Sequence, residues 1–248
     1  MTADAEAGRR DYGALTSEQQ AALDRAATTC GVSVLQLMEI AGWQVARWLF
    51  GIAAGRPLRV LVVAGHGNNG GDGLVAARHL LTWGFPVRIA LVADPDRLGE
   101  MVTLHLAAVR SLGGPIAVLP DGAIGEQEID AAEIVVDGLL GTGVRGDPRP
   151  PQAAAIMRLP AGRTVAIDVP SGLDASSGTP GTPTVQAIRT CTLTAMKAGL
   201  WTPSGRRHAG EITVADIGMP TAAWREAGLI PPARIRGGEL LTIPTDTV

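Results

Sequence analysis

The 248-residue chain has few aromatic residues, few cysteines and no long apolar run. Aromatic side chains make up only 3% of it, so a core must be built from valine, leucine, isoleucine and alanine. The two cysteines, Cys30 and Cys191, form no motif, and we interpret them as buried free thiols of a cytoplasmic protein. No apolar run is long enough to span a bilayer, and the polar first residues lack the apolar segment of a signal peptide.

Excess positive charge is also missing. The formal net charge is −3, which provides no electrostatic footprint for nucleic acid or for an acidic membrane surface. The sequence contains no Cys/His cluster, no P-loop and no Gly-x-Ser-x-Gly elbow. Glycine, by contrast, is abundant at 32 residues, and an apolar fraction of 46% is ample for a sizeable core. We therefore expect a globular protein with a small-molecule ligand.

Short apolar runs alternate with helical patterns, which predicts an α/β fold with βαβ units, a mostly parallel sheet and helices on both faces. Strands are expected at residues 59–64, 87–92, 116–119, 134–136, 164–167, 191–194 and 212–215. Helices are expected at residues 16–28, 34–49, 74–83, 96–112 and 151–159. The first two begin with capping boxes and form an N-terminal appendage, residues 16–50. Residues 1–14 are expected to be a flexible tail, and residues 221–248 a tail without a second core.

Three polar, glycine-rich stretches each follow a predicted strand directly. They span residues 65–73, 137–147 and 168–172. In parallel sheets, ligands bind outside the carboxyl ends of the strands, near the point where the strand order reverses. We therefore expect these stretches to meet at one site.

Two of these stretches contain the G-x-G-x-x-G spacing that is typical of dinucleotide-binding loops. The first has glycines at 65, 67 and 70, but its asparagines and Asp72 crowd the loop, and a carboxylate there would repel a pyrophosphate. The second has glycines at 141, 143 and 146, and it adds Thr142 and Arg145, which could hold a phosphate. A tight turn with Asp72 as a helix cap is the structural alternative for the first loop.

Aspartates end two apolar strands, where strand propensity and burial both disfavour them. Asp137 and Asp168 therefore need partners, and simple capping is the alternative to a ligand. With Asn69 and Ser171, Asp137 would offer the hard oxygen ligands that suit an alkali or alkaline-earth cation and not zinc. Lys197 follows a strand and could face this site, but a solvated lysine is the favoured interpretation.

Taken together, these motifs resemble those of the NAD(P)H-hydrate epimerases, which form the N-terminal domain of bifunctional NAD(P)HX repair proteins. The similarity extends over residues 15–220 and rests on five motifs. They are Leu37-Met38-Glu39 with Ala41-Gly42, residues 67–78 (GNNGGDGLVAAR), residues 137–143 (DGLLGTG), residues 168–172 (DVPSG) and Asp216-Ile217-Gly218. The resemblance implies a Rossmann-like three-layer αβα sandwich and a homodimer that the N-terminal helices help to form.

The resemblance also implies site residues. It assigns Asn69, Asp137 and Ser171 to a potassium ion. It assigns the hydrated nucleotide, NADHX or NADPHX, to Asn68, Asn69, Gly70, Gly71, Asp72, Gly141, Thr142, Gly143, Val144, Arg145, Gly146, Asp147 and Asp168. His66 departs from the family pattern, which usually has proline there. Nothing after Pro220 resembles the dehydratase domain, so we expect the dehydratase that acts on the product to be a separate polypeptide.

The expected reaction is interconversion of the R and S forms of the hydrated nicotinamide at carbon six, an isomerase reaction in metabolite repair. Asp168 is the expected acid and base for the departing hydroxyl and the returning water. Three alternatives remain at this point. The chain could be an NAD-dependent oxidoreductase with Asp94 at the ribose, a non-catalytic binding protein, or an enzyme that uses the same site for another small molecule.

Overall fold

An eight-stranded sheet forms the centre of the computed structural model, which describes residues 3–244. The strands are β1 (Val60–Ala64), β2 (Val87–Leu91), β3 (Ile116–Val118), β4 (Ile134–Gly138), β5 (Thr164–Ile167), β6 (Arg189–Leu193), β7 (Glu211–Ala215) and β8 (Leu240–Thr242). Their order is β3-β2-β1-β4-β5-β6-β7-β8, and only β8 pairs antiparallel, with β7. The mostly parallel sheet predicted from the sequence is confirmed.

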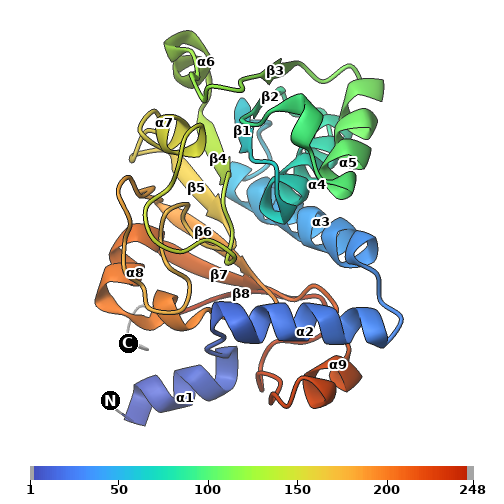
Figure 1. Ribbon diagram of the computed structural model, residues 1–248, viewed down its shortest axis with the longest axis vertical. Helices are drawn as coiled ribbons and strands as arrows, with labels where there is room; N and C mark the ends of the chain where they lie inside the picture. Colours follow the sequence, from blue (N-terminus) through green and yellow to red (C-terminus); the bar gives the residue numbers. More distant parts are fainter. Residues whose placement is uncertain (1–2, 245–248) are drawn as a thin grey trace.

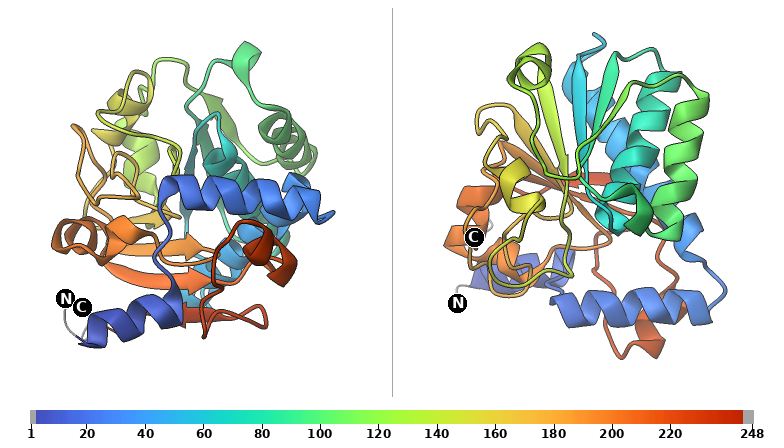
Figure 2. Two further views of the ribbon diagram at one scale, coloured as in Figure 1. Left: turned by 60° about the horizontal axis from the view of Figure 1, so that its bottom comes forward. Right: turned by 45° about the horizontal axis from the view of Figure 1, so that its top comes forward.

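Helices cover both faces of the sheet and make three layers (Figure 1). The helices are α1 (Ala3–Tyr12), α2 (Ser17–Thr29), α3 (Val34–Ala53), α4 (Asn68–Thr82), α5 (Glu100–Ser111), α6 (Glu126–Ala131), α7 (Gln152–Ile156), α8 (Pro203–Ala209) and α9 (Thr221–Glu226). Helices α3, α4 and α5 lie on one face, and α6, α7 and α8 lie on the other, as both views in Figure 2 show. This is the Rossmann-like αβα sandwich that the family resemblance implies.

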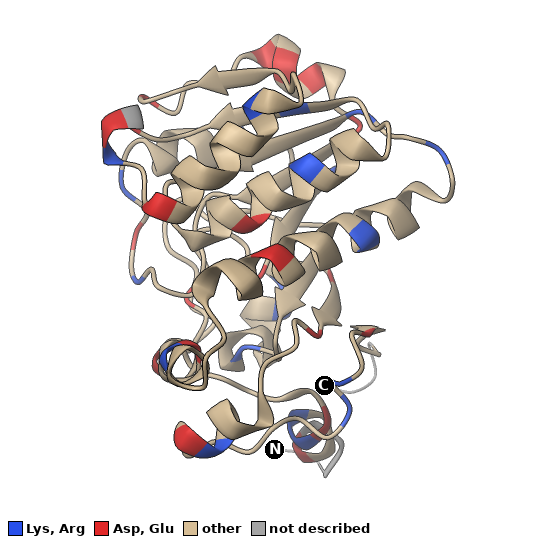
Figure 3. Cartoon of the chain, turned by 90° about the vertical axis from the view of Figure 1, so that its right-hand side faces the viewer, with Lys and Arg blue, Asp and Glu red and all other residues tan. Residues whose placement is uncertain are grey.

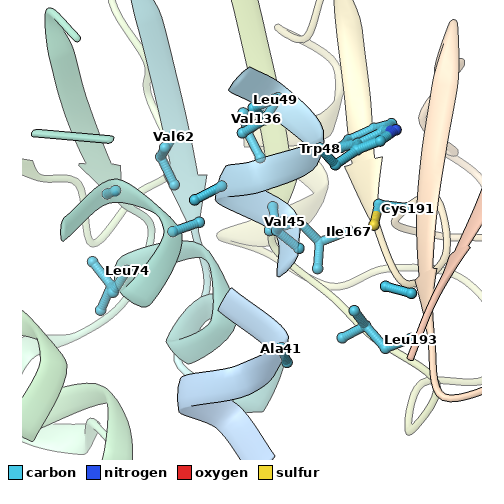
Figure 4. Packing of buried hydrophobic residues seen from close by; sticks show 14 of the residues in the cluster. Ala41, Val45, Trp48, Leu49, Val62, Leu74, Val136, Ile167, Cys191 and Leu193 are labelled. Carbon is cyan, nitrogen blue, oxygen red and sulfur yellow. The ribbon is translucent and has the colours of Figure 1, made fainter. Parts of the chain in front are cut away.

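Alternate residues of the central strands enter different cores. Along β1, Val60 and Val62 pack with α3, α4 and α5, whereas Leu61 and Val63 pack with α6 and α7. Successive side chains of a strand point to opposite faces, and a parallel sheet is buried on both. The largest cluster is centred on α3, whose residues Val45, Trp48 and Leu49 lie against the strands (Figure 4).

The strand order places a ligand site at the middle of the sheet. Strand β1 is followed by β2 on one side, and the chain later returns to β4 on the other side. The order therefore reverses between β1 and β4, which is where open α/β sheets bind ligands. The three glycine-rich stretches follow β1, β4 and β5, so they meet at this edge as expected.

The largest departure from the expected elements is the start of α4. The sequence predicts a loop up to residue 73, but the helix begins at Asn68, with Gly67 as the residue before it. Glycine has a low helix propensity, which favoured a loop. The packing overrides this preference, because a Cβ at Gly70 would lie 2.0 Å from the Gly65 carbonyl oxygen. Asn68, Asn69 and Asp72 therefore lie on a helix.

The chain ends are more ordered than expected. Residues 3–12 form helix α1, where a flexible tail was predicted, and the indole of Trp201 donates a hydrogen bond to the Gly13 carbonyl at 2.8 Å. Towards the other end, α9 contacts α2, and β8 joins the sheet. Residues 1–2 and 245–248 of the expected tails lie outside the described residues. The capping boxes of α2 and α3 are confirmed.

The cysteine interpretation is half right. Cys191 is fully buried in β6, whereas Cys30 is half-buried at the end of α2, 3.6 Å from the Glu226 carboxylate. Both are free thiols.

Over residues 3–244, we find no helix with the length and apolarity needed to cross a membrane. Figure 3 shows acidic and basic residues interspersed along α3, α4 and α5.

Two glycines on α3 provide a matched test of the packing between α3 and α4. A Cβ at Gly42 would lie 2.3 Å from the Val75 Cβ, whereas one at Gly51 would meet nothing within 4 Å. We expect Gly42→Ala to destabilise the protein by about 1–3 kcal/mol through overpacking. Gly51→Ala should leave the stability unchanged or raise it by up to about 1 kcal/mol, because alanine is the better helix former. Urea unfolding measures both, and equal effects would contradict the close approach of the two helices.

Candidate active site

A cavity of about 450 Å³ lies at the carboxyl ends of β1, β4, β5 and β6. Its floor comes from the start of α4, the loop after β4, Asp168 and the turn after β6. Its opposite wall comes from α2 and from the first part of α3, which supplies the apolar residues Val34, Leu37, Met38 and Ala41. The N-terminal helices thus close the site, a role that the sequence did not assign to them.

A buried hydrogen-bond network ties the loop after β4 to the loop after β5. The Ser171 hydroxyl donates to Asp137 Oδ1 at 2.6 Å, and the Ser171 amide donates to Asp137 Oδ2 at 2.8 Å. The Leu139 amide donates to Oδ1 as well, at 3.2 Å. Burial raises the pKa of Asp137 to about 6, although these hydrogen bonds oppose the shift. Asp137 is therefore a fully buried carboxyl that is held by three donors.

Asn69 joins the same network through a backbone carbonyl. Its Nδ2 donates to the Leu140 carbonyl at 2.9 Å, and the Ser171 hydroxyl lies 3.3 Å from that oxygen. The Asn69 Oδ1 is buried and accepts no hydrogen bond from the described residues. Buried acceptors are normally satisfied, so this orphaned oxygen indicates a partner that the protein itself does not supply. The structure thus brings Asn69, Asp137 and Ser171 together around the Leu140 carbonyl.

Asp168 pairs with a buried lysine. The Lys197 Nζ lies 2.5 Å from Asp168 Oδ1, 2.5 Å from the Leu193 carbonyl and 3.2 Å from the Ala195 carbonyl. A lysine ammonium has three donors, so these acceptors occupy all of them. The side chain of Lys197 is 1% exposed, and the interpretation of it as a solvated lysine is wrong.

Strained backbone surrounds this ion pair. Asp168 has φ +66° and Thr194 has φ +70°, a region that residues other than glycine rarely adopt. Thr194 is β-branched, so its conformation is the more costly one. Lys197 binds the carbonyls on both sides of Thr194 and so supports the turn that holds Asp168. The hydrogen bonds and the ion pair that Asp168 forms with the described residues all involve Oδ1, and Asp168 lines the cavity. Within residues 3–244, Oδ2 has no hydrogen-bond or ion-pair partner.

Two further aspartates face the cavity. Asp72 on α4 is buried, and its pKa is raised well above the usual range by burial and then by the nearby charges of Asp168 and Asp24. Asp24 on α2 accepts a hydrogen bond from Gln20 Nε2 at 2.8 Å, and burial raises its pKa too. Asp72 has no hydrogen-bond or ion-pair partner within residues 3–244, so the interpretation as a helix cap finds no support.

The remaining predicted residues divide into two groups. Asn68, Gly141, Thr142, Gly143 and Val144 line the cavity. Gly70, Gly71, Arg145, Gly146 and Asp147 are not part of its lining as the described residues form it.

Several polar groups near the cavity have partners within the protein. Arg145 is exposed and pairs with Glu18 at the start of α2, and Asp147 Oδ1 accepts from the Thr182 amide at 2.8 Å. The His66 ring lies 3.2 Å from Gln152 Nε2. Asp94 lies outside the lining formed by residues 3–244, and its side chain accepts from the Asp96 amide at 3.1 Å.

Sequence reasoning missed Asp24 and Gln20 and misread Lys197. The helical pattern of residues 16–28 placed Asp24 on a helix, but nothing in it indicated that this helix crosses the strand ends. Lys197 follows a predicted strand in the same way as Asp137 and Asp168, and that shared position was the available signal.

Comparison with known proteins identifies the family. The profile of the family described as "YjeF-related protein N-terminus" matches residues 34–199. The chain belongs to this family. The matched segment contains the starts of α3 and α4, the loops after β4 and β5, and Lys197. The resemblance drawn from the motifs is thereby confirmed.

Relatives in this family carry related names. A protein of Pyrobaculum aerophilum, "Bifunctional NAD(P)H-hydrate repair enzyme Nnr", is 41% identical over 218 residues, which cover 84% of this chain and 42% of that protein. The chain thus spans about two-fifths of the length of that relative. A protein of Pirellula staleyi, "NAD(P)H-hydrate epimerase", is 36% identical over 208 residues, which cover 81% of this chain and 90% of that protein.

A solved structure has the same fold. The crystal structure of the yeast protein YNL200c superposes with a TM-score of 0.78 and covers 93% of this chain and 99% of that one. The two chains are 23% identical, so the likeness concerns the fold alone.

The buried ion pair of Asp168 and Lys197 should contribute strongly to the stability of the folded protein. Lys197→Met leaves a buried carboxylate without its cation, and we expect a loss of about 3–5 kcal/mol in the free energy of unfolding. The double variant K197M/D168N should recover part of this loss, because no unpaired charge remains. Arg163→Met removes the exposed pair with Asp130 and should cost at most about 1 kcal/mol. If K197M and R163M unfold at the same urea concentration, Lys197 is not the partner that Asp168 needs.

Proposed function

We propose that the protein is an isomerase that interconverts the R and S forms of hydrated NADH and NADPH at carbon six of the nicotinamide ring. The observation that carries this proposal is the placement of Asp168, which lines a cavity together with residues of the stretches 65–73 and 137–147 and is held by Lys197 at Oδ1. A relative of similar length named NAD(P)H-hydrate epimerase supports the same activity. The start of α4 lines the cavity in which the nucleotide would bind.

The substrate would bind across the cavity floor. We assign the hydrated nucleotide to the start of α4, the loop after β4 and Asp168. Asn68, Asp72, Gly141, Thr142, Gly143 and Val144 line the cavity directly. Arg145 and Asp147 would contribute only after they release Glu18 and the Thr182 amide. Gly70 and Gly71 serve in this proposal by letting α4 approach Gly65 and Met38.

The chemistry needs one group that both gives and takes a proton. Protonated Asp168 Oδ2 donates its proton to the hydroxyl on carbon six. The carbon–oxygen bond then breaks, both electrons leave with the departing water, and the ring nitrogen lone pair forms a carbon–nitrogen double bond. Water attacks the other face of the planar cation, and its proton returns to Oδ2, so atoms and charges balance. Lys197 holds Oδ1 throughout and acts as a positioning residue.

A potassium ion fits the donor set beside this site. The orphaned Asn69 Oδ1, the Leu140 carbonyl and the oxygens of Asp137 and Ser171 are hard ligands that cluster in one network. Among the described residues, no group of three His, Cys, Asp or Glu side chains that could hold a metal ion was found. When bound, potassium would orient oxygens and offset the buried charge of Asp137.

The proposed assembly is a homodimer in which α3 helps to form the contact. Ile40, Trp43 and Phe50 are large apolar residues on α3 that are 37–49% exposed. Sedimentation equilibrium tests this, and a monomer at micromolar concentration would exclude it.

A dehydratase that consumes the product remains a prediction. Since the Pyrobaculum relative is bifunctional by name, its two activities share one chain, and the expectation of a separate polypeptide does not hold for every relative.

Asp168→Asn tests the proposed chemistry. We expect this variant to keep the fold and to lose epimerisation by about a hundredfold or more, because an amide cannot exchange the proton. Chromatography of a purified epimer of hydrated NADH, with and without enzyme, measures the rate. Asp130→Asn is the matched control at the opposite edge of the sheet, where Asp130 pairs with Arg163. An Asp168→Asn variant with the wild-type rate would remove Asp168 from the mechanism.

Potassium binding has a readout that does not depend on activity. We expect potassium chloride, but not choline chloride, to raise the Tm of the wild type by about 3 °C or more, because an ion that binds only the folded state stabilises it. Asn69→Ala should abolish this shift, since it removes the orphaned acceptor. Asn68→Ala, at the exposed neighbouring position, should retain it. An equal potassium shift in both variants would argue against the proposed ligands.

A further inference from the structure

The charges around the cavity do not balance. Among the described residues that line it, three are aspartates (Asp24, Asp72 and Asp168) and one is a lysine, Lys197. Lys197 gives one donor to Asp168 and the other two to backbone carbonyls, so it has no donor left for Asp24 or Asp72. Asp24 and Asp72 remain without an ion-pair partner within residues 3–244. The cavity therefore has excess negative potential.

An independent observation indicates that a ligand belongs there. Asp72 is 8% exposed, lines the cavity and has no hydrogen-bond partner within the described part of the chain. A buried carboxylate without donors is costly, and proteins rarely keep one without a compensating group. Burial, and then the nearby charges of Asp168 and Asp24, raise the pKa of Asp72. A positively charged group in the cavity would offset the charge of this carboxylate.

The opposite wall indicates what kind of cation fits. Val34, Leu37, Met38 and Ala41 of α3 give the cavity an apolar side, and Leu193 and Ile217 extend it. A bare metal ion requires oxygen ligands in all directions, which this wall does not offer. A flat organic cation needs apolar contact for its faces and negative charge nearby, and the cavity supplies both. Met38 is suited to this contact, because its side chain is flexible and polarisable.

We propose that Asp24, Asp72 and Asp168 recognise the nicotinamide-type ring in its positively charged state, the cation that forms when the hydroxyl leaves carbon six. This inference rests on the proposed function. It adds Asp24 of α2, which is outside every motif considered above, to the residues that act on the ring. Negative groups placed in advance where positive charge develops stabilise a transition state without having to reorganise.

Oxidised and reduced dinucleotides test the inference at equilibrium. The ring of NAD+ carries a positive charge and that of NADH is neutral, while the rest of the molecule is the same. Titration calorimetry at constant potassium should show that NAD+ binds about tenfold more tightly than NADH, the scale of one partly screened charge interaction. In Asp72→Asn and in Asp24→Asn, we expect this ratio to fall about threefold, because each variant removes one negative group.

Controls separate this result from a general charge effect. Asp130→Asn makes the same change in net charge at the opposite edge of the sheet and should keep the wild-type ratio. Asp24 is half-buried on α2, so its variant provides the test if Asp72→Asn fails to fold. Three results would overturn the inference: equal binding of the two nucleotides or no binding of either, a ratio that survives both active-site substitutions, or the same change in Asp130→Asn.

The outcome also separates the inference from the proposed function. Epimerisation is measured on the same wild-type preparation. If the enzyme epimerises hydrated NADH but shows no preference for the charged ring, the proposed function stands and the charge recognition is wrong. If the preference and its loss in the variants are found without epimerisation, the charge recognition stands and the proposed reaction is wrong.

Discussion

The close approach of the start of α4 to the ends of β1 and β4 is the constraint on which the rest of the site depends. Gly70 lies so near the Gly65 carbonyl, and Gly141 so near the Asn69 side chain, that a larger residue at either glycine would separate the segments or displace that side chain. Because these glycines allow contact, Asn69 reaches the Leu140 carbonyl, and Asp72 faces the cavity. Glycine here costs helix propensity and permits the geometry of the site.

Buried charge is handled in three different ways within one site. Asp137 is satisfied by three protein donors, and Asp168 is paired with an ammonium that has no donor left for any other group. Asp72 has neither kind of compensation. The first two arrangements fix the loops after β4 and β5. The third leaves a buried carboxylate whose negative charge a bound ligand could offset.

Local signals predicted much of the fold and part of the site. The apolar runs at residues 60–64 and 164–167 and the capping boxes at Thr16 and Ser33 depend on neighbouring residues, so they could be read directly. The start of α4 was misplaced because glycine propensity is local, whereas the contact that overrides it joins Gly70 to Gly65 across a turn. Lys197 was misread for a similar reason, since its partner Asp168 lies 29 positions earlier in the chain.

The sequence by itself determined the presence of β1 to β7 and of five helices (α2 to α5 and α7), the carboxyl-end position of the polar stretches and the family to which their motifs point. Periodicity, turn residues and short motifs are properties of neighbouring residues, so they can be recognised in the sequence alone. Only the tertiary structure decided that α2 and α3 close the cavity, that Asp24 and Asp72 line the same cavity, and that Lys197 is buried against Asp168. These facts depend on which helix crosses which strand ends, and the packing of the whole chain fixes that.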